Sequence, residues 1–148
     1  MSYENHASVW LYNKSDYYYK VRVRHHYTDQ GYDDSGWKML KPGGEVEVFD
    51  SITFWTGVFT TGGDTWKVAG LRMKEVKEEN ELTFKFDGKV LSVDAMDTIY
   101  EGDWYDHMLH PSDDGKTVCV YVRSKDLVTI ESPSHTSECQ FLNLFDYY

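Results

Sequence analysis

Residues 17–28 alternate between two kinds of side chain. One set is mostly apolar or aromatic and the other is polar and basic: Tyr17, Tyr19, Val21, Val23, His25 and Tyr27 against Tyr18, Lys20, Arg22, Arg24, His26 and Thr28. Side chains of an extended chain point alternately to opposite faces. The segment therefore predicts a long strand with one buried face and one basic face that is exposed to solvent.

Shorter runs of the same kind recur between turn residues. They predict further strands at Ala7–Tyr12, Trp37–Lys41, Glu45–Phe49, Trp66–Met73, Thr117–Arg123, Leu127–Glu131 and Gln140–Phe145. The charged residues Lys74–Asn80 are expected to form a turn. Residues 17–28 are expected to pair back on the first of these as a hairpin. Asp87-Gly88 predicts a second, two-residue hairpin between Glu81–Phe86 and Val90–Val93, and Gly70 predicts a bulge.

No segment predicts a helix longer than two turns, and no linker or repeat divides the chain. Many short strands separated by turns are typical of a sandwich. We therefore expect an all-β fold, a single-domain antiparallel β-sandwich of about eight to ten strands over residues 1–148.

Aromatic residues make up 16% of the chain, with 12 Tyr, 5 Trp and 7 Phe, and such side chains favour half-buried pleated surfaces. The tryptophans are expected to anchor the core. Phe54 and Trp55 are adjacent, so in a strand one of them faces away from the core. This makes Phe54 and Trp55 the candidates for a protein interface.

The net charge of −10 is concentrated in the second half of the chain. Such a chain is repelled by nucleic acid and by anionic lipid, so neither is expected as a partner. The N-terminal residues lack a basic start followed by an apolar core, which predicts a cytoplasmic protein. In that compartment Cys119 and Cys139 are expected to remain reduced.

The sequence offers few groups for chemistry. His107 and His110 lie near Asp103 and Asp106, but no third ligand is identifiable, so we expect solvated loop histidines and no metal site. A Gly-x-Ser-x-Gly elbow is absent, and Cys119 is expected to be a packing group in a strand. We therefore expect no enzymatic activity and no cofactor.

Two central motifs carry a family resemblance. Trp37 precedes a Leu-x-Pro-Gly turn, and residues 56–66 read Thr-Gly-x-x-x-Thr-Gly-x-Asp-x-Trp. This stretch resembles the nematode PUD proteins, small proteins that are up-regulated in long-lived insulin-signalling mutants. Residues 113–118 and 138–139 fit the same pattern more loosely.

The resemblance implies an aegerolysin-like β-sandwich and a heterodimer of two homologous PUD proteins, or self-association. It implies no known enzymatic activity. The function we expect is that of a non-enzymatic, cytosolic interaction protein linked to the longevity response. The alternative is a binding module for a lipid headgroup or a glycan, which an aegerolysin-type architecture allows, although no matching lipid-binding motif is present.

Overall fold

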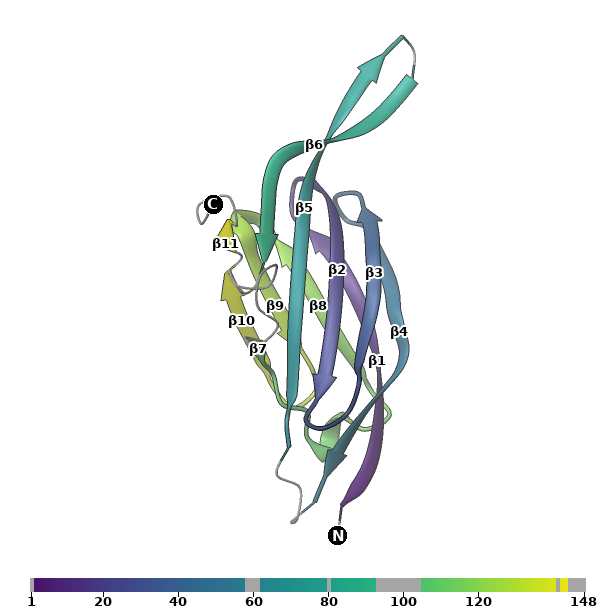
Figure 1. Ribbon diagram of the computed structural model, residues 1–148, viewed down its shortest axis with the longest axis vertical. Helices are drawn as coiled ribbons and strands as arrows, with labels where there is room; N and C mark the ends of the chain where they lie inside the picture. The colour runs from purple at the N-terminus through teal and green to yellow at the C-terminus, as the bar shows by residue number, and fades with distance from the viewer. Residues whose placement is uncertain (1, 58–61, 80, 93–104, 141, 144–148) are drawn as a thin grey trace.

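The computed structural model describes residues 2–57, 62–79, 81–92, 105–140 and 142–143. This part of the chain confirms the all-β class, because its strands form two sheets packed as a sandwich (Figure 1). The strands are β1 (Tyr3–Lys14), β2 (Tyr18–Tyr27), β3 (Tyr32–Leu40), β4 (Glu45–Thr56), β5 (Asp64–Glu78), β6 (Glu81–Ser92), β7 (Tyr105–Asp106), β8 (Thr117–Arg123), β9 (Leu127–Glu131), β10 (Thr136–Gln140) and β11 (Leu142–Asn143). The described helices are two 3₁₀ turns, η1 (Pro111–Asp113) and η2 (Ser124–Asp126), and none in this part of the chain is long and apolar enough to cross a membrane.

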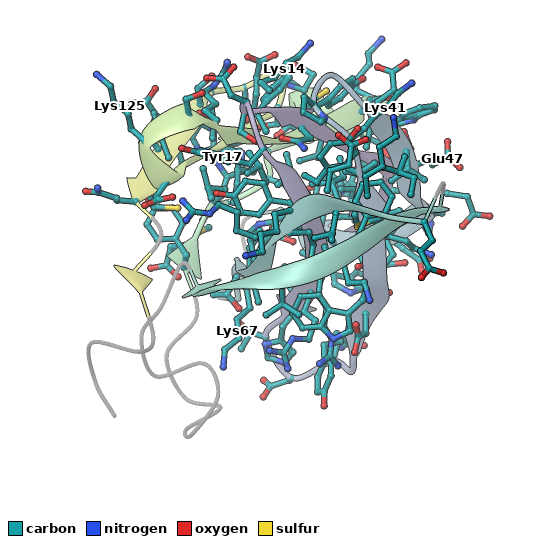
Figure 2. All side chains as sticks on the ribbon, turned by 90° about the horizontal axis from the view of Figure 1, so that it is seen from above. Lys14, Tyr17, Lys41, Glu47, Lys67 and Lys125 are labelled. Carbon is teal, nitrogen blue, oxygen red and sulfur yellow. The ribbon has the colours of Figure 1, made fainter. Side chains whose placement is uncertain are left out.

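One sheet has the strand order β10-β9-β8-β1-β4 and the other β11-β6-β5-β2-β3, with β7 also paired to β5. Among the described strands, β1 and β8 pair in parallel, and the other pairs are antiparallel. Figure 2, which looks down on the sandwich, separates the two layers: Lys14 and Lys125 lie on one side and Lys67 of β5 on the other. The five-stranded sheet thus combines β1 and β4, from the first half of the chain, with β8, β9 and β10 from the second half.

The core lies between the inner faces of the two sheets and follows the predicted alternation. In β2 the residues Tyr19, Val21, Val23, His25 and Tyr27 are buried, while Tyr17 lies outside the strand and is exposed. In β8 every second residue, Val118, Val120 and Val122, is fully buried. The alternation of apolar and polar residues therefore predicted correctly which faces of these strands are buried.

The expected hairpin between the first two strands is wrong. β1 pairs with β4 and β8, whereas β2 pairs with β3 and β5 in the other sheet. The chain changes sheets at the buried Asn13, whose amide donates to the carbonyls of Tyr17, Leu40 and Lys41 at 2.8, 3.1 and 3.1 Å. Its side-chain oxygen accepts from Ser15, so this one side chain replaces the hydrogen bonds of a hairpin turn.

The second predicted hairpin is also wrong. β6 continues through Asp87-Gly88, since Leu71 pairs with Val90 and Met73 with Phe86. Three residues of β6 therefore lie opposite Arg72 alone, which makes this a bulge rather than a turn. Both flanks already pair with β5, so no turn is needed, and the irregularity falls close to Gly70, where a bulge was expected.

Beyond this bulge β5 and β6 continue as a two-stranded ribbon that projects from the body of the sandwich (Figure 1). We call it the arm, and it comprises residues 74–78 of β5 and 81–86 of β6. The charged segment after Met73 was expected to be a turn. It is instead part of a strand, because its backbone pairs with β6.

Other boundaries vary in accuracy. β8 and β9 have the predicted bounds. β3 starts at Tyr32 rather than Trp37, because its polar first half still pairs with β2 and Arg22 forms an ion pair with Asp34. The last strand was expected at Gln140–Phe145, where the described residues form the end of β10 and β11.

We expect Asn13→Ala to destabilise the fold more than a substitution that deletes a solvent-exposed hydrogen bond. It removes the amide that donates to the Leu40 and Lys41 carbonyls and the oxygen that accepts from Ser15, and the loss of such buried hydrogen bonds costs about 1–3 kcal/mol of unfolding free energy. Urea unfolding measures the change. Thr117→Ala, which removes an exposed contact with Ser8, is the control; equal losses in the two variants would contradict the role of Asn13.

Candidate functional site

The two interface candidates lie on opposite sides of β4. Phe54 is 0% exposed and belongs to the core. Trp55 is half-buried and lines a pocket at the edge of the sandwich. Of the pair, only Trp55 is therefore available to a partner or ligand.

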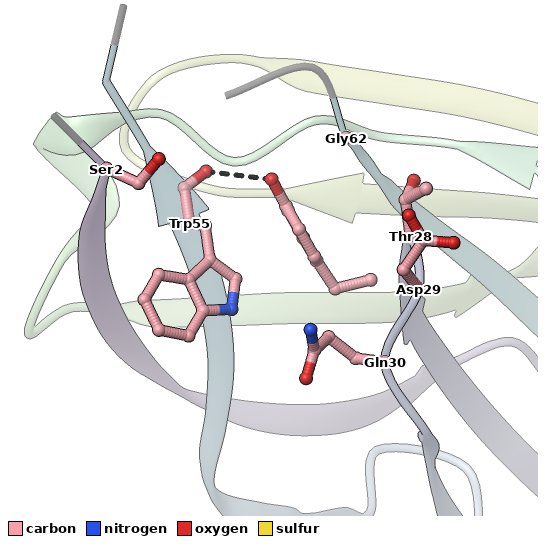
Figure 3. A pocket seen from close by; sticks show the side chains of 7 residues that line it. Ser2, Thr28, Asp29, Gln30, Trp55 and Gly62 are labelled. Atoms are coloured by element: carbon pink, nitrogen blue, oxygen red, sulfur yellow. Dashed lines mark hydrogen bonds between the residues drawn. The ribbon is translucent and has the colours of Figure 1, made fainter. Parts of the chain in front are cut away.

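The pocket beside Trp55 is a cavity of about 240 Å³ (Figure 3). The end of β2 and the turn after it provide one wall, and β4 the other. Its lining residues are Ser2, Tyr27, Thr28, Asp29, Gln30, Trp55 and Gly62. We call this cavity the Trp55 pocket.

The walls of the Trp55 pocket are held by specific contacts. The Tyr27 hydroxyl donates to the Trp55 carbonyl at 3.2 Å. Thr28 Oγ1 accepts from the Gly63 amide at 3.0 Å. A Cβ at Gly62 would meet the Tyr27 ring at 2.9 Å, so glycine is needed for this close approach.

The Trp55 indole leaves one polar group unsatisfied. Among the described residues, its Nε1 is the buried side-chain nitrogen or oxygen that has no hydrogen-bond partner. Figure 3 shows this nitrogen turned toward Gln30 across the pocket. Buried donors are almost always paired in native proteins, so this N–H marks a place where an acceptor is missing.

A buried polar network lies behind the pocket. His25 Nδ1 contacts Asp33 Oδ2 at 3.0 Å and His25 Nε2 contacts Asp64 Oδ1 at 2.6 Å. The second oxygen of Asp64 accepts from the Leu109 amide at 3.0 Å. Burial lowers the pKa of His25, but the hydrogen bonds to Asp33 and Asp64 outweigh it and the net pKa is raised, which favours the charged imidazolium between two carboxylates.

The network continues through Trp66 to His107. The Trp66 indole packs on His25 and donates to the His107 carbonyl at 3.0 Å. His107 Nδ1 contacts Ser137 Oγ at 2.7 Å and His107 Nε2 contacts Ser132 Oγ at 2.9 Å. His107 is 1% exposed, so the expectation of a solvated loop histidine is wrong for it, because β9 and β10 cover the ring.

His107 is held neutral. Burial is the main cause, and the neighbouring His135, stacked at 4.1 Å between ring centroids, adds to it, so the pKa of His107 falls to about 4. His110, the other member of the predicted pair, is exposed. Asp113 accepts from the amides of His110 and Ser134, and these bonds outweigh burial and lower its pKa.

These titratable groups have structural roles. Both ring nitrogens of His25 and of His107 are engaged by protein side chains, and both rings are buried. The residues that the structure describes include no group of three or more His, Cys, Asp or Glu placed to hold a metal ion. Of the two carboxylates near the predicted histidine pair, Asp106 is exposed, and Asp103 lies outside the described residues.

A second surface was missed by sequence reasoning. It lies on the outer face of the six-stranded sheet and along the arm, and we call it the arm face. Trp37 and Leu82 are 44% and 52% exposed. The members of the arm face are Tyr18, Trp37, Met39, Leu82 and Phe84.

The arm face includes a hollow. The rings of Tyr18 and Phe84 lie 4.7 Å apart, which joins β2 to the arm. With Met39 and the β3–β4 turn they line a cavity of about 510 Å³. The signal was present as the alternation Trp37-x-Met39 and Leu82-x-Phe84, but Trp37 was counted as a core residue and Leu82 and Phe84 as part of a tight hairpin.

The remaining predictions about single side chains are mixed. Trp66 is fully buried as expected, Trp10 and Trp55 are half-buried, and Trp104 lies outside the described residues. The basic face of β2 is only partly exposed to solvent. Lys20 is exposed, but Arg24 is buried beside Lys67, its cross-strand neighbour. Arg22 holds Asp34 in two hydrogen bonds, which lower the pKa of Asp34 to about 2.

The two thiols are free. Cys139 packs against the core, and burial raises its pKa to about 12. A thiol with so high a pKa is a poor nucleophile at neutral pH. It therefore serves as a packing group.

A comparison with protein families identifies the chain. The model of the family described as "Up-Regulated in long-lived daf-2" matches residues 3–101. The chain belongs to this family, the PUD family. No curated protein matches the chain.

The motif at residues 56–66, which carries the resemblance to the PUD family, has a structural explanation. Thr56 accepts from the Asn5 amide at 2.8 Å and closes the end of β4 against β1. Gly62 makes room for Tyr27, Asp64 holds His25, and Trp66 fills the core. The described residues of the motif thus help to build one end of the sandwich, and one of them, Gly62, lines the Trp55 pocket.

The low pKa of His107 predicts a pH dependence of stability. An unfolded histidine binds a proton near pH 6.5, whereas folded His107 does so near pH 4. Its contribution is present above pH 6.5 and is lost as the pH falls toward 4, by up to about 3 kcal/mol of unfolding free energy. Urea unfolding at several pH values measures this slope.

The variant His107→Gln isolates the effect. It should flatten the slope between pH 6.5 and pH 4, because glutamine does not titrate, whereas the exposed His6→Gln should leave it unchanged. His25 has the opposite sign and does not mimic the effect, since its raised pKa stabilises the fold at low pH. An unaltered slope in His107→Gln would show that His107 is not the group responsible.

Proposed function

We propose that this PUD-family protein is a non-enzymatic, cytosolic interaction protein that assembles with a homologous PUD protein, or with a second copy, through the arm face. The family description associates it with the long-lived daf-2 state. The aegerolysin-like nature of the sandwich is part of the same proposal and rests on the sequence resemblance.

The arm is the observation that carries the proposal. It projects from the sandwich as a two-stranded ribbon (Figure 1) and exposes Leu82 and Phe84. Isolated two-stranded ribbons are only marginally stable in water. A partner that covers the arm and the hollow beside it would bury these side chains and stabilise the ribbon.

Charge complementarity supports a related chain as the partner. The exposed cations Lys20 and Lys41 lie beside the apolar members of the arm face. Glu45 lines the same hollow, so the rim carries both signs of charge. The chain itself carries a net charge of −10, so a second copy or a similarly acidic homologue supplies carboxylates for the two lysines. Such pairs direct the docking orientation more than they raise affinity.

The proposed absence of enzymatic activity is supported by the way two of the described histidines, His25 and His107, are used. His25 and His107 are buried, with both ring nitrogens in contact with protein groups. A general acid or base must reach the substrate within hydrogen-bond distance. Neither ring meets that condition.

A second candidate function is binding of a small ligand, a lipid headgroup or a glycan. The Trp55 pocket favours it, because a half-buried tryptophan with an unpaired N–H lines a cavity of about 240 Å³. Assembly through the arm face leaves this pocket open, since the two surfaces lie at opposite ends of β2. Both functions are therefore compatible in one protein.

We expect the protein to sediment as a dimer at micromolar concentration, alone or mixed with a paralogue, and Phe84→Asp to weaken that dimer. Stable interfaces bury about 1,200–2,000 Å² in total, and a charge at a central aromatic position weakens binding by about thirtyfold or more. Analytical ultracentrifugation gives the mass, and far-UV circular dichroism checks the fold.

Two matched variants locate the interface. Tyr32→Asp alters an exposed aromatic residue at the other end of β3 and should leave the dimer intact. Trp55→Asp tests the interface predicted from the sequence: dissociation by this variant and not by Phe84→Asp would move the interface to β4. A monomer both alone and with the paralogue would refute assembly.

A further inference from the structure

We infer that the Trp55 pocket binds a neutral, hydroxyl-rich ligand the size of one sugar ring. This inference rests on the second function proposed above and names the chemical class of its ligand. It follows from the polar groups of the pocket, from their charge and from the space between the aromatic walls.

The first argument is the unpaired donor. Trp55 Nε1 is buried without a hydrogen-bond partner, and an unmade bond of this kind costs about 1–3 kcal/mol. An indole N–H can only donate. The ligand must therefore place an acceptor oxygen in the pocket.

The second argument is charge. The lining residues that the structure describes include the carboxylate of Asp29 and no lysine, arginine or histidine, so a phosphate or carboxylate group meets repulsion without a compensating cation among them. A cation gains from Asp29 alone and brings no acceptor for the unpaired Trp55 Nε1. Both arguments favour a neutral ligand.

The third argument is the mixture of donors and acceptors. Asp29 only accepts, Trp55 only donates, and the Gln30 amide does both. A hydroxyl group is donor and acceptor at once, so it suits the Trp55 N–H and the Gln30 side chain that faces it (Figure 3). The Thr28 hydroxyl is already engaged by Gly63 and fixes the loop instead.

The fourth argument is shape. The half-buried ring of Trp55 provides an apolar surface on which the C–H groups of a sugar ring can pack. The volume of about 240 Å³ lies below the range typical of drug-sized ligands, about 300–1,000 Å³. One ring fits this space.

The pocket is also preorganised. Tyr27 is fixed by its bond to the Trp55 carbonyl and by close packing on Gly62. The turn after β2 holds Asp29 at a positive φ of 62°, and the backbone N–H of Gln30 donates to the Tyr27 carbonyl at 3.0 Å. Little ordering is needed on binding, which lowers the cost of association.

Proton–nitrogen correlation NMR of the labelled full chain tests the inference. The probes are the methyl glycosides of glucose, galactose and mannose, and N-acetylglucosamine, each at millimolar concentration. We expect at least one of them to shift the indole signal of Trp55 saturably, together with the backbone signals of Gln30 and Gly62. The indole signal is assigned by its loss in Trp55→Phe.

Two variants test the contacts. Trp55→Phe keeps an aromatic wall but removes the donor, and should weaken binding about threefold to tenfold, the worth of one hydrogen bond. Asp29→Asn removes the charge and keeps the shape, and should weaken binding while allowing phosphate to enter. Trp37→Phe, an exposed tryptophan on the arm face, is the matched control and should leave binding unchanged.

Phosphocholine and inorganic phosphate are the competing probes. Saturable shifts at Trp55 from either of them, with none from the glycosides, would overturn the ligand class but retain a small-ligand function. No shift from any probe would overturn both. Glycoside binding that is equally strong in Trp55→Phe and Asp29→Asn would show that the glycosides bind outside this pocket. Sedimentation of the same samples measures assembly independently of ligand binding.

Discussion

The position of β1 between β4 and β8 is the constraint on which the rest of the sandwich depends. β1 pairs antiparallel with β4 and parallel with β8, so one N-terminal strand joins an early strand and a late strand in a single sheet. A parallel pair cannot be closed by a tight turn and needs a long connection. Residues of the other sheet supply that connection, and this forces the chain to cross between layers.

The two ends of β1 are fixed by buried asparagines, and each supports a different surface. Asn13 holds the β3–β4 turn through carbonyls of Leu40 and Lys41, and this turn borders the hollow of the arm face. Asn5 binds Thr56 at the end of β4, one residue from Trp55. Polar side chains inside the fold therefore position both the proposed assembly surface and the proposed ligand pocket, at opposite ends of the same strand.

The polar network of His25, Asp64 and His107 connects elements that hydrophobic packing alone would leave loosely specified. It ties β2, β3 and β5 to the loop after β7 and to the β9–β10 region through directional bonds. A buried network of this kind is costly when only part of it is satisfied, and specifies a unique arrangement when all of it is. The shifted pKa values in it are consequences of burial and of neighbouring charges.

Local pattern was sufficient wherever one strand alone carries the information. The alternation in residues 17–28 and 117–123 predicted the strands and their buried faces, because side-chain direction has a period of two whatever the strand pairs with. It also determined that Phe54 and Trp55 point to opposite sides. Pairing could not be obtained in this way: Asp87-Gly88 has the composition of a hairpin turn, but both flanks pair with β5.

The site needed contacts between distant segments. The Trp55 pocket is completed by Gln30 and Ser2, which lie far from Trp55 in the sequence, and His107 is buried only because Ser132 and Ser137 close over its ring. Burial and pKa depend on what surrounds a group in space, and no local pattern records that. The sequence by itself thus determined the class, the strand faces and the family likeness; the tertiary structure decided the pairing, the arm and the pocket.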